Sequence, residues 1–143
     1  MPVTITTASA SQPLNVLGEQ LRPLTPAGLS IEVFETTGPE QVGPPPHRHP
    51  WDELYAVLDG ALEVFDGQAW HQATAGACAC IPAGQVHAYR NASPGCRFLT
   101  IVGPGHAREL FEQLDAEVTT APPDMGTVLA VAARNDVEVV LAG

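Results

Sequence analysis

The sequence predicts a mainly β fold, a barrel or sandwich of short strands. Fourteen prolines and thirteen glycines are spread through the 143 residues, and both residue types are unfavourable inside helices. From Leu54 onward, short apolar runs alternate with glycine. Closely spaced strands with turn signals between them are typical of barrels and sandwiches. A chain of this length is about one domain long, so we expect a single core.

The chain is expected to consist of three consecutive segments within one domain. Residues 1–30 form an N-terminal strand or arm with a strand candidate at Val3–Thr7, and residues 31–104 form the barrel core. SIEVFET is the next strand, and the runs LYAVLDG, ALEVFDG, ACACIPAG and CRFLTIV follow it. Asp59-Gly60 and Asp66-Gly67 predict tight hairpin turns, because glycine accepts a positive φ without steric cost.

The remaining residues, 105–143, are predicted to be a helical extension packed on the barrel. In HARELFEQLDAEV the apolar residues Ala107, Leu110, Phe111 and Leu114 recur at helical spacing, which predicts one apolar face that covers the outside of the barrel. MGTVLAVAARN is a second helix candidate with Asp124 as its N-cap. VEVVLAG ends the chain as a strand or a loose tail.

Charge and hydropathy narrow the possible partners and location. Six basic and sixteen acidic residues give a net charge of −10, which argues against nucleic acid and anionic membranes as partners. No apolar stretch approaches the roughly 20 residues needed to span a bilayer. The segment MPVTITTASASQP lacks the basic start and apolar core of a signal peptide. We therefore expect a cytoplasmic protein.

The chain has three cysteines, Cys78, Cys80 and Cys96. An odd number without framework spacing predicts free thiols. Cys78 and Cys80 alternate along a strand and point to one face, where we expect buried packing rather than a reactive role.

The stretch HRHPWDELYAVLDG, residues 47–60, brings together side chains of the metal-ligating type. In an extended chain His47 and His49 project to the same face. Glu53 falls on that face too if the strand parity holds through Pro50-Trp51. Three ligand-type side chains are therefore expected to converge.

Two spaced motifs complete the pattern. The first is Gly43, His47, His49, Glu53 and Gly60, and the second is Gly76, Pro82, Gly84, His87 and Asn91. Five fixed residues match by chance with a probability on the order of 10⁻⁷ per starting position. Together the motifs resemble those of the cupin family, although fewer residues separate Gly43 from His47 than is usual there. The resemblance implies a jelly-roll barrel, the double-stranded β-helix of small quercetinase-like or conserved-barrel bacterial cupins, with one or two C-terminal helices.

The same resemblance implies that His47, His49, Glu53 and His87 bind one divalent metal ion. Imidazole and carboxylate ligands suit Fe, Mn, Ni, Co, Cu or Zn. Four protein ligands leave two octahedral positions open, which favours chemistry or exchangeable ligand binding. Glu53 is also a candidate base. Strand parity places Tyr55 beside Glu53 and Tyr89 beside His87, where either is a candidate hydrogen-bond donor or simply fills the barrel.

The function implied is a metal-dependent enzyme acting on a small organic molecule, in the first place an oxidoreductase of the dioxygenase type. One alternative is an isomerase, cyclase or lyase that uses the metal as a Lewis acid. Another is a non-catalytic module that binds or senses a small molecule. The resemblance also implies a homodimer, with Val3–Thr7 as the strand that crosses between copies, because pairing removes exposed sheet edges.

Overall fold

The computed structural model describes residues 2–140 of the chain. They form eleven strands and two helices, and every strand pairing is antiparallel. The strands are β1 (Leu14–Val16), β2 (Glu19–Pro23), β3 (Glu32–Thr37), β4 (His47–Arg48), β5 (Asp52–Asp59), β6 (Ala61–Phe65), β7 (Trp70–Thr74), β8 (Cys78–Ile81), β9 (Ala88–Asn91), β10 (Arg97–Gly103) and β11 (Glu138–Val139). The helices are α1 (Ala107–Glu117) and α2 (Met125–Arg134).

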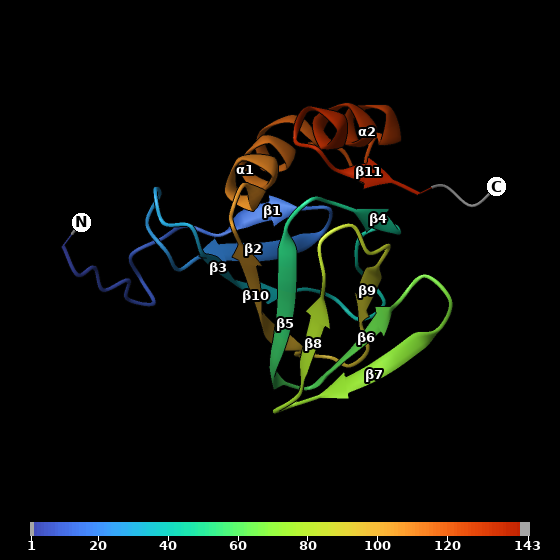
Figure 1. The fold of residues 1–143 in the computed structure, drawn as a ribbon, viewed down its shortest axis with the longest axis horizontal. Helices are drawn as coiled ribbons and strands as arrows, with labels where there is room; N and C mark the ends of the chain where they lie inside the picture. Colours follow the sequence, from blue (N-terminus) through green and yellow to red (C-terminus); the bar gives the residue numbers. More distant parts are fainter. Residues whose placement is uncertain (1, 141–143) are drawn as a thin grey trace.

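Two sheets form the walls of the predicted jelly-roll barrel (Figure 1). The larger sheet has six strands in the order β1-β2-β3-β10-β5-β8, and the smaller has three in the order β7-β6-β9. A third pair, β11 and β4, joins the C-terminal segment to the first histidine motif. The sequence-based prediction of a β-barrel with C-terminal helices is confirmed.

Alternation along the strands decides which side chains face inward. On β5, Glu53, Tyr55 and Val57 are buried, whereas the residues between them are more exposed. On β10, Phe98, Thr100 and Val102 are buried in the same way. Because side chains of a strand point alternately to opposite faces, these residues line the barrel interior.

The two Asp-Gly pairs behave differently from each other. Asp66-Gly67 lies in the hairpin between β6 and β7, as predicted. Asp59-Gly60 does not close a hairpin, because β5 and β6 belong to different sheets. It is a corner at which the chain changes sheet. Gly60 has a φ of +75° there, and a Cβ at this position would meet the Ser93 side chain and the Cys96 backbone.

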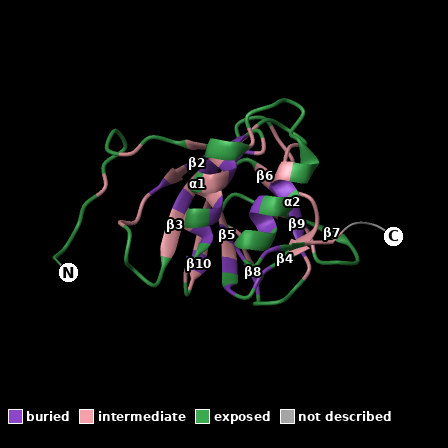
Figure 2. Cartoon of the chain, turned by 90° about the horizontal axis from the view of Figure 1, so that it is seen from above, coloured by how far each residue is buried: buried purple, intermediate pink, exposed green. Residues whose placement is uncertain are grey.

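The predicted strand at Val3–Thr7 is absent from the structure of the single chain. Residues 2–7 have no strand pairing, and Val3 and Ile5 are 94% and 83% exposed. The segment extends away from the body of the molecule (Figures 1 and 2). A strand needs a neighbour to hydrogen-bond with, and here the first pairing begins at Leu14, where β1 and β2 extend the larger sheet.

Both predicted helices are confirmed, but their position is not the predicted one. Leu110 and Leu114 of α1 are buried in one cluster with Leu21. Leu21 belongs to the inward-facing set of the larger sheet. The helices therefore close one end of the barrel rather than cover its outside (Figure 1). The Glu32 carboxylate accepts hydrogen bonds from the backbone N–H groups of Ala107 and Arg108 at the start of α1, where negative charge stabilises a helix.

The cysteines are free, as predicted, but Cys78 and Cys80 are exposed and only Cys96 is buried. In the β5–β8 pairing, Glu53 lies opposite Ile81, whereas Cys80 lies opposite Leu54 on the other face. The shared face of the two cysteines is thus the outer face of the barrel, which overturns the expected buried packing. Neither helix in residues 2–140 is long and apolar enough to cross a membrane.

Gly43, the first residue of the motif, packs directly on β9. A Cβ at this position would overlap the carbonyl oxygen of Tyr89. We expect Gly43→Ala to lower the free energy of unfolding by about 1–3 kcal/mol, the usual cost of overpacking. Gly126→Ala is the control, because a Cβ there finds no contact closer than 3.8 Å and alanine favours helix. Chemical denaturation measures both, and equal stability of Gly43→Ala and the native chain would contradict the packing.

Candidate metal centre

The four predicted ligands come together inside the barrel. His47 and His49 lie at and just after β4, Glu53 lies on β5, and His87 immediately precedes β9. One donor atom from each lies within 4.8 Å of the others. His49, Glu53 and His87 are 4%, 5% and 1% exposed, and His47 is partly buried.

Backbone pairing between the two motifs sets this arrangement. The N–H of His47 donates to the carbonyl of His87, and the N–H of His87 donates to the carbonyl of His47, both at 2.9 Å. The carbonyl of His49 accepts from the N–H of Gly84 at 2.8 Å. On the other side of His47, β11 pairs with β4, with Val139 opposite His47. The two motifs therefore lie side by side in the fold, although His47 and His87 are forty positions apart in the sequence.

The orientation of the three imidazoles is set by backbone carbonyls. The Nδ1 atom of each ring lies 2.8 to 3.1 Å from a carbonyl oxygen, with His47 on Pro45, His49 on Trp51 and His87 on Gln85. A carbonyl only accepts hydrogen bonds, so Nδ1 of each ring carries the proton. In each ring Nε2 is therefore the nitrogen that can give its lone pair to a metal ion, and the ion displaces any proton that this atom carries.

These nitrogens point at a carboxylate, which leaves a place for a cation. The Nε2 atoms of His49 and His87 lie 3.0 and 3.1 Å from Oε2 of Glu53. Burial would raise the pKa of Glu53, but the His49 and His87 rings hold it well below its usual range, so the carboxylate is ionised. Burial lowers the pKa of His47 to about 4, which keeps that ring neutral at pH 7. A divalent ion satisfies such a set of nitrogen and oxygen donors at once, so the residues fit a single metal ion.

Two aromatic side chains hold the ligands in place. The hydroxyl of Tyr55 donates to Oε2 of Glu53 at 2.9 Å. The Trp51 ring stacks on His49 with 4.4 Å between centroids and 8° between planes. Ligand positions fixed by such contacts lose little entropy when a metal binds.

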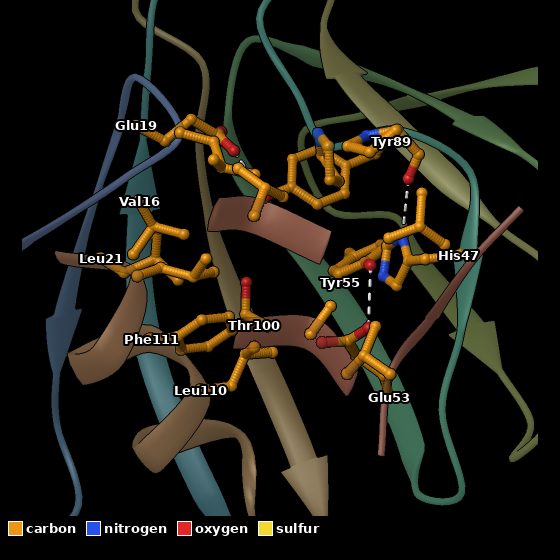
Figure 3. Close-up of a pocket in the computed structure, with 18 residues that line it drawn as sticks. Val16, Glu19, Leu21, His47, Glu53, Tyr55, Tyr89, Thr100, Leu110 and Phe111 are labelled. Atoms are coloured by element: carbon orange, nitrogen blue, oxygen red, sulfur yellow. Dashed lines mark hydrogen bonds between the residues drawn. The ribbon is translucent and has the colours of Figure 1, made fainter. Parts of the chain in front are cut away.

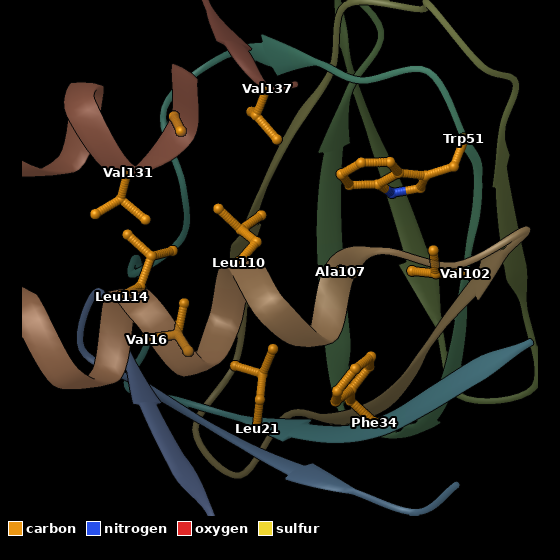
Figure 4. Close-up of a cluster of buried hydrophobic side chains, with 11 residues drawn as sticks. Val16, Leu21, Phe34, Trp51, Val102, Ala107, Leu110, Leu114, Val131 and Val137 are labelled. Atoms are coloured by element: carbon orange, nitrogen blue, oxygen red, sulfur yellow. The ribbon is translucent and has the colours of Figure 1, made fainter. Parts of the chain in front are cut away.

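The candidate metal site borders a cavity of about 80 Å³. His47 and Glu53 form one wall of it, and Tyr55 and Tyr89 lie between them and Glu19 (Figure 3). The other lining residues are mostly apolar side chains from β1, β2, α1, α2 and the segment around β11. Trp51 belongs instead to the neighbouring apolar cluster with Val102 and Leu110 (Figure 4). The helices therefore form the lid over the candidate site.

Sequence reasoning missed Glu19, although it lines this cavity. Glu19 is 2% exposed, and it accepts hydrogen bonds from the Tyr89 hydroxyl at 2.6 Å and from the Asn91 amide at 3.0 Å. Burial raises the pKa of Glu19 to about 7 against the opposing effect of these two hydrogen bonds. The signal was the alternation of Val16, Glu19 and Leu21 around the turn at Leu17-Gly18, which puts a carboxyl on the apolar face.

We expect the chain to bind one divalent transition metal ion. Glu53→Gln and His87→Ala should each weaken that binding by more than ~100-fold, because loss of a ligand lowers metal affinity more than loss of a residue that only orients a ligand. His71→Ala is the control, because His71 is exposed and within residues 2–140 its side chain pairs only with Asp66, at 2.7 Å. Calorimetric titration with Co²⁺ and elemental analysis measure the affinity and stoichiometry. Equal affinity in His87→Ala and His71→Ala would exclude the assigned ligand set.

Comparison with known proteins places this geometry in a family. Residues 33–102 match the family profile described as "Cupin domain". A search of curated proteins found no match. Among solved structures, an RmlC-like cupin from Shewanella frigidimarina aligns with a TM-score of 0.66 and 15% identity, covering 75% of this chain and 96% of that one.

Two further structures carry descriptions of an activity. The polyketide cyclase RemF from Streptomyces resistomycificus aligns with a TM-score of 0.63 and 22% identity, over 73% of this chain and 81% of that one. Pac13, described as a nucleoside dehydratase and known from Streptomyces, aligns with a TM-score of 0.64 and 14% identity, over 76% of this chain and 88% of that one. At these identities the likenesses show the fold. With its two motifs, its jelly-roll barrel and the matching profile, the chain belongs to the cupin family.

Proposed function

We propose that the protein is a metal-dependent enzyme that acts on a small organic molecule, in the first place as an oxidoreductase of the dioxygenase type. The observation that carries the proposal is that His47 and Glu53, two of the four residues with converging donor atoms, lie in the wall of a mainly apolar cavity. A purely structural metal site is closed off by its ligands. A site that faces a cavity has room for an exchangeable ligand.

The chain's own residues support this chemistry in three ways. The imidazoles and Glu53 hold their donor atoms at fixed positions through the Nδ1 and Tyr55 hydrogen bonds. Leu110, Phe111 and Val128 in the lid give the cavity an apolar lining, and an apolar site strengthens electrostatic interactions and protects reactive species. A redox-active divalent ion held there would supply Lewis acidity and electron exchange with dioxygen. Vicinal oxygens on the substrate suit the two positions that four protein ligands leave open.

A second candidate function is a non-redox isomerase, cyclase or lyase reaction at the same site. The hydrogen-bonded pair of Glu19 and Tyr89 in the cavity wall supports it, because such reactions depend on positioned proton donors and acceptors. The fold likeness to a polyketide cyclase and a nucleoside dehydratase also supports it. A third candidate function is a non-catalytic module that binds or senses a small molecule without converting it.

The test is a screen of small chelating phenols, diketones and hydroxy acids with the protein loaded with Fe²⁺ or Mn²⁺, in air and under anaerobic conditions. A dioxygenase consumes oxygen in proportion to substrate and stops without it. Glu53→Gln should lose activity by more than ~100-fold, since it loses a metal ligand, and His71→Ala should keep it. Turnover that is equal without oxygen would assign the non-redox candidate, and tight binding without turnover would assign the sensing module.

We also propose that the chain forms a homodimer through its N-terminal arm. Val3 and Ile5 are almost fully exposed on a segment whose apolar and threonine residues alternate. The β8 strand is an edge of the larger sheet in the described residues, with unpaired backbone groups on one side. An alternating segment and an open edge are complementary by β-augmentation, and a second copy supplies both in one symmetric contact.

Light scattering should give twice the 15.0 kDa mass of the chain. Deleting residues 2–10 should give a monomer whose circular dichroism is unchanged, because this segment has no strand pairing within its own chain. The double substitution of Val3 and Ile5 by serine should weaken the dimer, whereas Thr4→Ser should not. A monomeric native chain would refute the proposal.

A further inference from the structure

The outer face of β8 carries two exposed thiols. Cys78 and Cys80 are free and exposed, whereas the third cysteine, Cys96, is buried. Cysteine is among the residue types most often buried, and an exposed thiol is open to oxidation. Ala56 and Leu54, which lie opposite the two cysteines on β5, are only partly buried. A chemical role therefore accounts for the pair better than packing does.

The strand that carries the two thiols is held from its other face. Ala79 and Ile81 alternate with the cysteines and point into the barrel, where Ala79 packs against a buried cluster and Ile81 is 5% exposed. Pairing with β5 runs along all four residues of β8, which lies beside β5 in the larger sheet (Figure 1). The thiols are thus presented to solvent at fixed positions, and this lowers the entropy cost of binding an ion between them.

The two sulfur atoms are placed to share one ion. Residues two apart on a strand are separated by about 6.6 Å and project to the same face. The Sγ atom of Cys78 lies 4.0 Å from the carbonyl oxygen of Ala79, the residue between the two cysteines, so it is turned toward Cys80. Partial burial, and after it the neighbouring Cys80 thiol, raises the pKa of Cys78, as expected where two thiols lie side by side.

This spacing suits a bridging ion better than a disulfide. Two metal–sulfur bonds of about 2.3 Å laid end to end span about 4.6 Å. Two side chains that project in parallel reach this separation by leaning toward each other. A disulfide instead has its Cα atoms most often about 5.5–6 Å apart, and the strand spacing lies near the upper limit for the bond.

The number of ligands narrows the kind of ion. Within residues 2–140, the one group of three or more histidine, cysteine and acidic side chains that could hold a metal ion is the candidate metal centre. The thiol pair therefore offers two protein ligands. Zn²⁺ takes four ligands in structural protein sites, and Ca²⁺ and Mg²⁺ take oxygen ligands. Soft thiolate ligands select Cu(I), which is satisfied by two sulfur atoms in line.

We propose that Cys78 and Cys80 form a second metal site, on the outside of the barrel, that binds one Cu(I) ion between their sulfur atoms. The site is independent of the proposed function and lies on the face of the sheet opposite to Glu53 and Ile81. Both S–H bonds break when the ion binds, and the two protons go to solvent. Each sulfur gives an electron pair to copper, whose oxidation state does not change.

The experiment follows the transfer of Cu(I) to the full chain. The protein is first loaded with Co²⁺, so that the metal centre is occupied, and excess cobalt is removed. It is then titrated under anaerobic conditions into the coloured complex of Cu(I) with bicinchoninate, whose absorbance falls as the protein takes the ion. The native chain is compared with Cys78→Ser, Cys80→Ser and the control Cys96→Ala, which removes a buried thiol and leaves the surface pair intact.

We expect the native chain and Cys96→Ala to take up one Cu(I) per chain, and each serine variant to bind it more than ~100-fold more weakly, since one thiolate is left. Both serine variants should keep the native circular dichroism, because both positions are exposed. An excess of Zn²⁺ should not displace the copper, and the X-ray absorption spectrum of the loaded native chain should show two sulfur neighbours.

Two kinds of result would overturn the second site. One is uptake that is equal in the native chain and both serine variants, or no uptake by the native chain. The other is a stoichiometry of one copper ion per two chains, because the ion would then bridge two copies instead of the two cysteines of one strand.

Discussion

The reciprocal pair of backbone hydrogen bonds between His47 and His87 is the contact on which the candidate site depends. It joins two motifs from distant parts of the chain and places their side chains on one side of the barrel wall. The other contacts of the site refine the geometry that this pairing sets. Pro45, Trp51 and Gln85 orient the three rings through their carbonyls, and Gly43 lets the neighbouring backbone approach Tyr89 closely.

The C-terminal segment has a structural and a functional part in the same place. β11 pairs with the strand that carries His47, and Val140 donates its N–H to the carbonyl of Pro46. The helices before it fill the open end of the barrel with Leu110, Leu114 and Val131. Apolar side chains of the helices therefore line the cavity as well as stabilise the fold. The helices of the lid are thus connected, through β11, to the strand that carries His47.

Sequence patterns predict the chemistry of this chain better than its topology. Residue type, spacing and strand parity indicated that His47, His49 and Glu53 share a face, and the resemblance of the second motif to that of the cupin family added His87. Parity alone does not say which face is the interior, and so Cys78 and Cys80 were assigned to the wrong one. A helical apolar stripe likewise shows that α1 is buried on one side but not against what. Asp59-Gly60 shows a turn without showing that the next strand changes sheet.

Glu19 escaped prediction for a related reason. Carboxylates are mostly exposed, and only the pairing of β2 with β3 shows that this one faces the cavity. The most direct test of the account is anomalous diffraction from crystals of the metal-loaded protein. The account predicts one anomalous peak per chain, about 2.0–2.2 Å from the Nε2 atoms of His47, His49 and His87 and from a carboxylate oxygen of Glu53. An anomalous peak at another place, or one that lies at ligand distance from the Nδ1 atoms instead of the Nε2 atoms, would contradict it.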